Sequence, residues 1–377
     1  MSPNRLQQLH DAGVSIWLDF IDRELLSSGR LRRMIEEDFV TGETTNPTIF
    51  EKALAEGSAY DDQLSGAGRE LAPAELFELV ETEDVRAACD IFAEVYDRTA
   101  GGDGYVSIEV SPAAANDADA TVREAQRLWH AVDRPNLMVK VPGTAEGAIA
   151  VRQLIGQGIN VNITLLFAIN AHARVIDAYI AGLEDRLRGG NPIDRVASVA
   201  SFFVSRVDSE VDKRLDVIAA AKPEAERGPI LRLRGKAAIA NAKLAYRLFE
   251  AKFSGERWER LAAKGARLQR PLWASTGTKN PEYGDTIYVE ELIGPNSVNT
   301  LPPATLDAFR DHGEVRQSIT EGLDQAQLCL AELEAAGISM EEVTDKLLAD
   351  GLASFQKSFD QLTAGLGKKM SLLVPST

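Results

Sequence analysis

The sequence has few of the residues that build disulfide frameworks or metal centres. It contains only two cysteines, Cys89 and Cys329, and both fall in helix-like stretches, which argues against a disulfide framework or a thiolate cluster. Its four histidines show no HExxH-like spacing, so we expect no metal site. We also expect no nucleotide cofactor, because neither a GxGxxG turn after the first predicted strand nor a GxxxxGK[ST] loop is present.

Positive charge and long apolar runs are also scarce. Lysine and arginine total 41 against 57 acidic residues, a formal net charge of −16 that would repel nucleic acids and anionic membranes. Any phosphate must therefore be bound by local contacts. No segment reaches the roughly 18 uninterrupted apolar residues that a membrane helix needs, and the N-terminus lacks a secretory pattern. These absences predict a cytoplasmic protein that binds neither nucleic acid nor membrane.

Short apolar runs alternate with longer amphipathic segments along the 377 residues, a pattern typical of parallel α/β architecture. The runs predict eight strands, and α/β barrels of this length can form one domain, so we expect residues 1–377 to form a single (β/α)8 TIM barrel. The predicted strands are 14–19, 39–45, 105–110, 136–141, 159–164, 196–204, 271–276 and 296–301.

Helical periodicity predicts crossover helices at 120–132, 168–187 and 205–220. Segment 51–104 is expected to be a largely helical insertion. Residues 314–377 are expected to add helices, at 314–337 and 340–366, that pack across one end of the barrel. Whether those last helices cover a functional site, and whether the chain is a monomer or a homodimer, stays open at this point.

Polar residues occupy one parity of several predicted strands. In a barrel one parity faces the helices and the other points inward. Val139 and Val141 alternate with Lys140, and Ile108 and Val110 flank Glu109, so Lys140 and Glu109 are expected to point inward. The same reasoning, applied near the C-terminal strand ends where such barrels carry their active sites, adds five further residues. These are Asp19, Asn162, Thr164, Ser201 and Ser275.

Lys140 and Glu109 alone would fit a structural ion pair on neighbouring strands. The other polar residues favour chemistry, because a buried pair does not need so many polar neighbours. Apolar neighbours such as Val139 and Met138 disfavour the ammonium form of Lys140 and would leave a nucleophilic amine. Such an amine can form an iminium with a ketone, and a Schiff-base aldol reaction then needs two carboxylates. Glu109 and Asp19 are the candidates.

Seven segments together resemble transaldolase in its long bacterial form, over nearly the whole chain. They are WLDFIDRELL, GETTNPTIFEKAL, VSIEVSP, LMVKVPGTAEG, GINVNITLLF, ASFFVSRVD and LWASTGTKNP. The resemblance implies a class I aldolase barrel without a cofactor. It implies transfer of a dihydroxyacetone unit from sedoheptulose 7-phosphate or fructose 6-phosphate to an aldose phosphate, a reaction of the pentose phosphate pathway.

By position in these motifs, Lys140 resembles the Schiff-base lysine and Asp19 the base at the cleaved carbon's hydroxyl. Glu109 resembles the acid-base residue that works with Thr164 through a water. Asn46 and Asn162 resemble hydroxyl-binding amides. Three further residues complete the set that the resemblance implies: Ser201 as a wall of the site, Phe203 beside it, and Arg206 as a phosphate-binding arginine.

The chain departs from the family pattern at the second phosphate contact. Many members carry an arginine two residues after the serine of the seventh strand, but here Ser275 is followed by Thr276 and Gly277. We expect Ser275 and Lys279 to supply this contact.

Two other functions remain to be weighed. An aldolase of the fructose 6-phosphate aldolase kind would release free dihydroxyacetone; by resemblance it has Gln where this chain has Glu109 and Tyr where it has Phe203, so both positions favour transaldolase. A noncatalytic barrel is the second alternative, since a fold does not establish a function. The complete polar set argues against it.

Overall fold

The computed structural model describes residues 4–45, 57–67 and 71–373. Its centre is a closed barrel in which eight parallel strands pair in chain order, and β8 pairs with β1 to complete the ring. The predicted fold class is therefore confirmed, and each predicted strand overlaps an observed one. The strands are β1 Val14–Leu18, β2 Val40–Thr44, β3 Tyr105–Glu109, β4 Leu137–Pro142, β5 Val161–Leu166, β6 Ser198–Phe203, β7 Gln269–Ala274 and β8 Ser297–Leu301.

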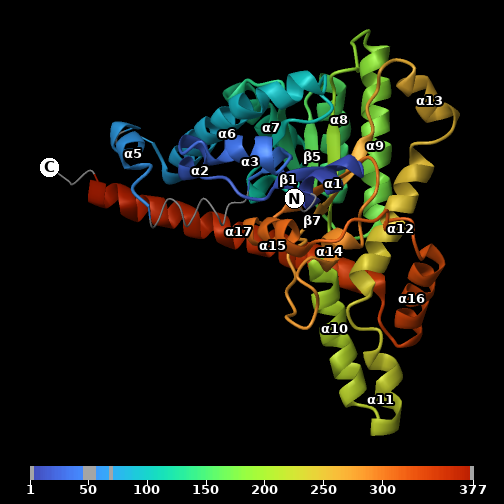
Figure 1. Cartoon of the computed structure of the whole chain (residues 1–377). Coiled ribbons are helices and arrows are strands. Elements are labelled where there is room, and N and C mark those ends of the chain that lie inside the picture. The colour runs from blue at the N-terminus through green and yellow to red at the C-terminus, as the bar shows by residue number, and fades with distance from the viewer. Residues whose placement is uncertain (1–3, 46–56, 68–70, 374–377) are drawn as a thin grey trace.

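Helices surround the barrel and connect its strands (Figure 1). Those after β3 are α7 Ala118–Val132, α8 Ala145–Gln157, α9 Ile169–Arg188, α10 Ser205–Ala220, α11 Glu224–Leu231, α12 Ala237–Lys252, α13 Glu256–Ala262, α14 Ile287–Glu290 and α15 Pro303–His312, with the short 3-10 helix η1 Pro112–Ala114 before α7. Those before β3 are α1 Arg5–Asp11, α2 Arg23–Ser27, α3 Arg30–Glu37, α5 Asp61–Ala67 and α6 Pro73–Arg98. No described helix is long and apolar enough to cross a membrane.

After α15, the chain continues in α16 Leu323–Ala335 and α17 Met340–Leu373. The prediction of a helix from residue 314 was wrong at its start, because Gly322 adopts a left-handed conformation as the N-cap of α16. The residues before it instead contact the loop that leads into β8. The backbone amides of Ser318 and Ile319 both donate to the Ile293 carbonyl in that loop. Helix α17, red in Figure 1, contacts α10, α6 and α5 and so runs across one face of the barrel.

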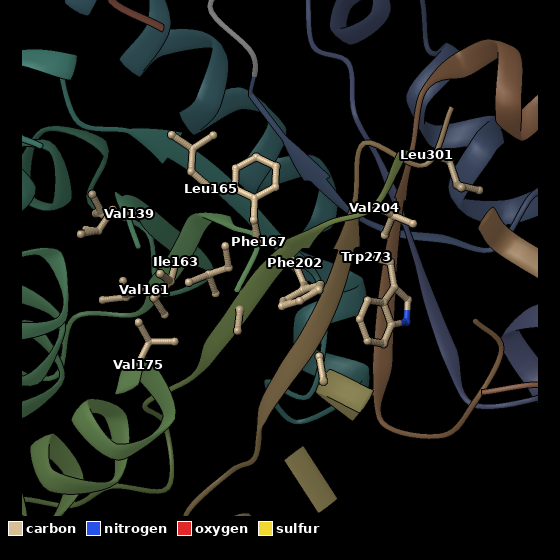
Figure 2. Packing of buried hydrophobic residues seen from close by; sticks show 14 of the residues in the cluster. Val139, Val161, Ile163, Leu165, Phe167, Val175, Phe202, Val204, Trp273 and Leu301 are labelled. Carbon is tan, nitrogen blue, oxygen red and sulfur yellow. The ribbon is translucent and has the colours of Figure 1, made fainter. Parts of the chain in front are cut away.

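The alternation of side chains separates two apolar regions. One lies between strands and helices; Figure 2 shows part of it, with Val139, Val161 and Ile163 near Val175 of α9. The other fills the barrel interior and includes Met138 and Trp17. Met138 and Val139 therefore face opposite sides, as the strand parity predicts.

A polar cluster lies at the N-terminal end of the barrel. Asp103 accepts hydrogen bonds from the Trp17 indole at 2.8 Å and from the Ser15 hydroxyl. Gly42 lies against Trp17, where a Cβ would approach the indole within 2.5 Å, so this strand position accepts no side chain. A cavity of about 160 Å³ lies beside this end, and a larger one of about 230 Å³ lies at the opposite end, where the strands end.

Candidate active site

Lys140 and Glu109 meet inside the C-terminal end of the barrel. They are paired residues in the register of β3 and β4, which places both side chains on the inward face. Lys140 Nζ lies 2.9 Å from Glu109 Oε2 and also donates to the Thr45 carbonyl at 3.1 Å. Their side chains are 11% and 8% exposed. Lys140 therefore has a carboxylate partner, which the strand pattern alone, with its apolar neighbours Val139 and Met138, did not show.

Asp19 directly follows β1 and reaches the same cavity as Lys140. The Thr44 hydroxyl donates to Asp19 Oδ1 at 3.0 Å and lies 2.9 Å from the Thr300 hydroxyl. Burial raises the pKa of Asp19 above its usual value, although the charge of Lys140 and the Thr44 hydrogen bond act in the opposite direction. A carboxylate with a raised pKa is a stronger base, which suits removal of a proton from a hydroxyl.

Asn162 is in register with Lys140 but does not line the cavity. Its side chain is fully buried, and it accepts a hydrogen bond from the Ser201 hydroxyl at 2.6 Å and donates to the Ser107 hydroxyl at 3.0 Å. Thr164, two residues further along β5, does line the cavity, as Ser201 does. The sequence-predicted Asn46 lies outside the described residues.

Besides Lys140, two basic side chains line the cavity, from α10 and from the segment after β7. Arg206 stands in the first turn of α10, with its guanidinium carbon 5.4 Å from the centre of the Phe203 ring. Lys279 is exposed and lines the same cavity. Neither Arg206 nor Lys279 forms an ion pair within the described ranges, so both charges remain available. Burial lowers the pKa of Arg206.

Ser275 reaches the cavity by a route that strand parity does not predict. β7 ends at Ala274, and Ser275 follows with a left-handed φ of 55°. Both residues consequently line the cavity although they are adjacent in sequence. The Ser275 hydroxyl lies 3.1 Å from the Ser205 hydroxyl, which links the end of β7 to the start of α10.

Helix α17 covers part of the site, which answers the question left open by the sequence. The cavity has a volume of about 230 Å³, and α17 lines it with Gly351, Ser354, Phe355 and Ser358. No local pattern in the sequence could assign these residues, because their role depends on how a distant helix packs. Thr44 and Thr300 were also missed, but the alternation rule applied to β2 and β8 would have found them, since Gly42 and Val298 face inward.

Within the described part of the chain, no three histidine, cysteine, aspartate or glutamate side chains are grouped to hold a metal ion. The arrangement instead offers an amine, two carboxylates and two free cations around one cavity. That set can form an imine, move protons and hold an anionic substrate.

Comparison with known proteins agrees with this chemistry. The family model described as Transaldolase/Fructose-6-phosphate aldolase matches residues 16–366. The transaldolase of Thermobifida fusca is 49% identical over 368 residues, covering 97% of this chain and 98% of its own length. The transaldolase of a Parafrankia species is 50% identical over 359 residues, covering 95% of each chain. Transaldolase 1 of Streptomyces coelicolor is 47% identical over 367 residues, covering 97% of this chain and 94% of its own length. The chain therefore belongs to the transaldolase/fructose-6-phosphate aldolase family.

Proposed function

We propose that this chain is a transaldolase that transfers a dihydroxyacetone unit through a Schiff base on Lys140. The donor is sedoheptulose 7-phosphate or fructose 6-phosphate, and the acceptor is glyceraldehyde 3-phosphate or erythrose 4-phosphate. The observation that carries the proposal is the 2.9 Å contact between Lys140 and Glu109 in a cavity that Asp19 also lines. The names of the relatives, at about half identity over nearly the whole chain, support transfer rather than release of the enamine.

The first half of the reaction forms the iminium. Glu109 takes a proton from the Lys140 ammonium, and the free amine attacks the ketone carbon of the donor. Glu109 then returns the proton to the carbinolamine hydroxyl, which leaves as water. Thr164 and Glu109 line the same cavity, which supports the expectation that Glu109 works with Thr164 through a water.

The second half breaks and remakes a carbon–carbon bond. Asp19 takes the proton from the hydroxyl beside the scissile bond, an aldose phosphate leaves, and the electron pair moves into the iminium to give an enamine. The acceptor aldehyde then reacts with the enamine by the reverse of these steps, and water releases the new ketose from Lys140. Asp19 carries a raised pKa, which favours its acting as the base.

The phosphate is held by Arg206 with Ser275 and Lys279. Arg206 lies in the first turn of α10, where the partial positive charge of the helix end adds to its own. Its guanidinium offers two parallel hydrogen bonds to a phosphate, whereas Lys279 adds a point charge at the cavity rim. We further propose that Asn46 and Asn162 serve the substrate hydroxyls, Asn162 by fixing Ser201. A cytoplasmic location, and assembly as monomer or homodimer, stay predictions.

Borohydride trapping tests the proposal. The protein is incubated with fructose 6-phosphate, reduced and digested, and the modified peptide is identified by mass spectrometry. We expect a dihydroxyacetone adduct on Lys140 and none on Lys243, another lysine shielded from solvent. The Lys140→Met variant should give no adduct while it remains folded. An unmodified Lys140 in folded wild-type protein would refute the proposal.

A coupled assay for free dihydroxyacetone, with donor and no acceptor, separates transfer from release. A transaldolase turns over little under these conditions and accelerates when acceptor is added. Equal turnover with and without acceptor would indicate an aldolase instead.

A further inference from the structure

A second cavity lies behind Glu109. It has a volume of about 530 Å³ and is bounded by α6, by the segment that follows β3, by α7 and by α17. Glu109 and Phe355 line both this cavity and the one that contains Lys140, so Glu109 forms part of the wall between them. A change of charge in the second cavity can therefore act on Glu109 without contact with the substrate.

Helix α6 places Glu81 in this second cavity. The side chain is only 4% exposed and, within the part of the chain that the structure describes, forms no hydrogen bond or ion pair. The neighbouring acids have partners: Glu78 pairs with Arg127, and Glu124 accepts hydrogen bonds from the amide and hydroxyl of Ser111. A buried, unpartnered carboxylate is costly to ionise, which favours the neutral acid at Glu81.

Most of the charges around Glu81 also favour its neutral form. Burial raises the pKa of Glu81 well above its usual value, and the negative charge of Glu109 raises it further. The positive charge of Lys140 lowers the pKa of Glu81, whereas the negative charges of Glu124 and Asp84 raise it. The guanidinium of Arg127 is already held between Glu78 and Glu124. Helix α17 presents no ionisable group to the cavity, only Phe355, Gln356 and Phe359.

We propose that Glu81 is a positioning residue for the Schiff-base chemistry, acting through Glu109 from the second cavity. The proposal rests on the function proposed for Lys140. While Glu81 is neutral, Glu109 is the ionised member of the two and can exchange a proton with Lys140. The pKa of Glu81 is raised, so Glu81 ionises only above the usual pH range of a carboxyl group, and its added negative charge beside Glu109 then reduces the amount of free amine. Helix α6, whose role the sequence did not reveal, thereby contributes to the active site.

The experiment measures the rate of borohydride trapping with fructose 6-phosphate as a function of pH in wild type and in Glu81→Gln. The amide keeps the shape of the neutral acid but cannot ionise. We expect similar rates near neutral pH and a variant-to-wild-type ratio that rises by roughly tenfold toward about pH 9.5. The ratio at each pH cancels the pH dependence of the reagent itself. Glu78→Gln is the matched control, since it removes the same charge one turn earlier on α6 from a group that Arg127 already neutralises.

Glu81→Leu is the second variant and should behave like Glu81→Gln at alkaline pH. It should also fold, because it replaces an unpartnered buried carboxyl with an apolar side chain of similar size. A ratio that stays flat with pH in both variants, with adduct still forming on Lys140, would overturn the role of Glu81 and leave the proposed function intact. A ratio that rises equally in Glu78→Gln would also overturn it. Absence of adduct in wild type would overturn both proposals.

Discussion

The Thr44 hydroxyl lies between Asp19 and Thr300, donating to Asp19 Oδ1 at 3.0 Å while standing 2.9 Å from the Thr300 hydroxyl. The first two strands of the chain and the last one therefore together hold the carboxylate proposed to act as the base. Because this hydrogen bond lowers the pKa of Asp19 against the effect of burial, the hydroxyl keeps the carboxylate ionised at lower pH than it would be alone.

Thr44→Val should therefore raise the pKa of Asp19 and remove the hydrogen bond that holds its carboxylate in place. Asp19 must be ionised to act as a base, so the acid limb of the kcat profile should move to higher pH, and kcat at neutral pH should fall by roughly tenfold. The measurement is kcat against pH in the coupled transaldolase assay. Thr41→Val is the matched control, because Thr41 lies on the same strand but bonds the Ile16 carbonyl away from the site. An acid limb at the wild-type position in Thr44→Val would contradict the role of this hydroxyl.

Gly351→Ala should disturb the wall that α17 gives to the active site. A Cβ at Gly351 would lie 2.9 Å from Leu165 Cδ2, and Leu165 is itself buried in a left-handed conformation. The helix or Leu165 must shift, so we expect KM for the ketose phosphate to rise by roughly threefold to tenfold.

Gly365→Ala on the same helix is the control, because nothing lies within 4 Å of its Cβ position. There the better helix propensity of alanine should stabilise the protein by about 1 kcal/mol and leave kinetics unchanged. The measurements are steady-state kinetics and urea unfolding for both variants. Identical KM values in the two variants would show that α17 does not shape the site.

Lys279→Gln should weaken substrate binding with little change in kcat. The lysine contributes a point charge at the cavity rim, so KM for a phosphorylated donor should rise by roughly tenfold at low salt and by less at high salt, where screening already weakens the attraction. Lys222→Gln, at an exposed lysine beyond the other end of α10, controls for the change in net charge. If the effect of Lys279→Gln equals that of Lys222→Gln, the phosphate contact lies elsewhere.

His172→Leu should make the protein less sensitive to acid. His172 is fully buried, neither ring nitrogen has a hydrogen-bond partner among the described residues, and burial lowers its pKa from 6.5 to about 4. Between those values the unfolded chain takes up a proton that the folded protein does not, so stability is lost as pH falls through this window. The loss from this histidine amounts to about 3 kcal/mol and should be absent in His172→Leu.

Urea unfolding at about pH 7 and about pH 4.5 measures this difference. Exposed His130→Gln serves as control and should retain the wild-type pH dependence. A wild-type slope in His172→Leu would show that other groups cause the acid sensitivity.

The strands and the inward direction of Lys140 and Glu109 could be predicted because alternation is a local property of the chain. The position of Ser275 could be predicted only in part, since its left-handed backbone, rather than strand parity, turns it toward the cavity. Phe355 and Glu81 could not be assigned at all. Both are carried by helices whose place against the barrel depends on packing between segments distant in sequence, and periodicity reports only which face of a helix is apolar.

The hydrogen-bonded group of Asp19, Thr44 and Thr300 also has a consequence for folding. β1 and β8 are the first and last strands of the ring, and the Asp19 amide donates to the Leu301 carbonyl at 2.9 Å where they meet. An intermediate with most of its strands and helices formed but the ring still open would lack this arrangement, whatever its helix content. During refolding, the return of enzymatic activity should therefore lag behind the circular dichroism signal and report the moment at which the barrel closes.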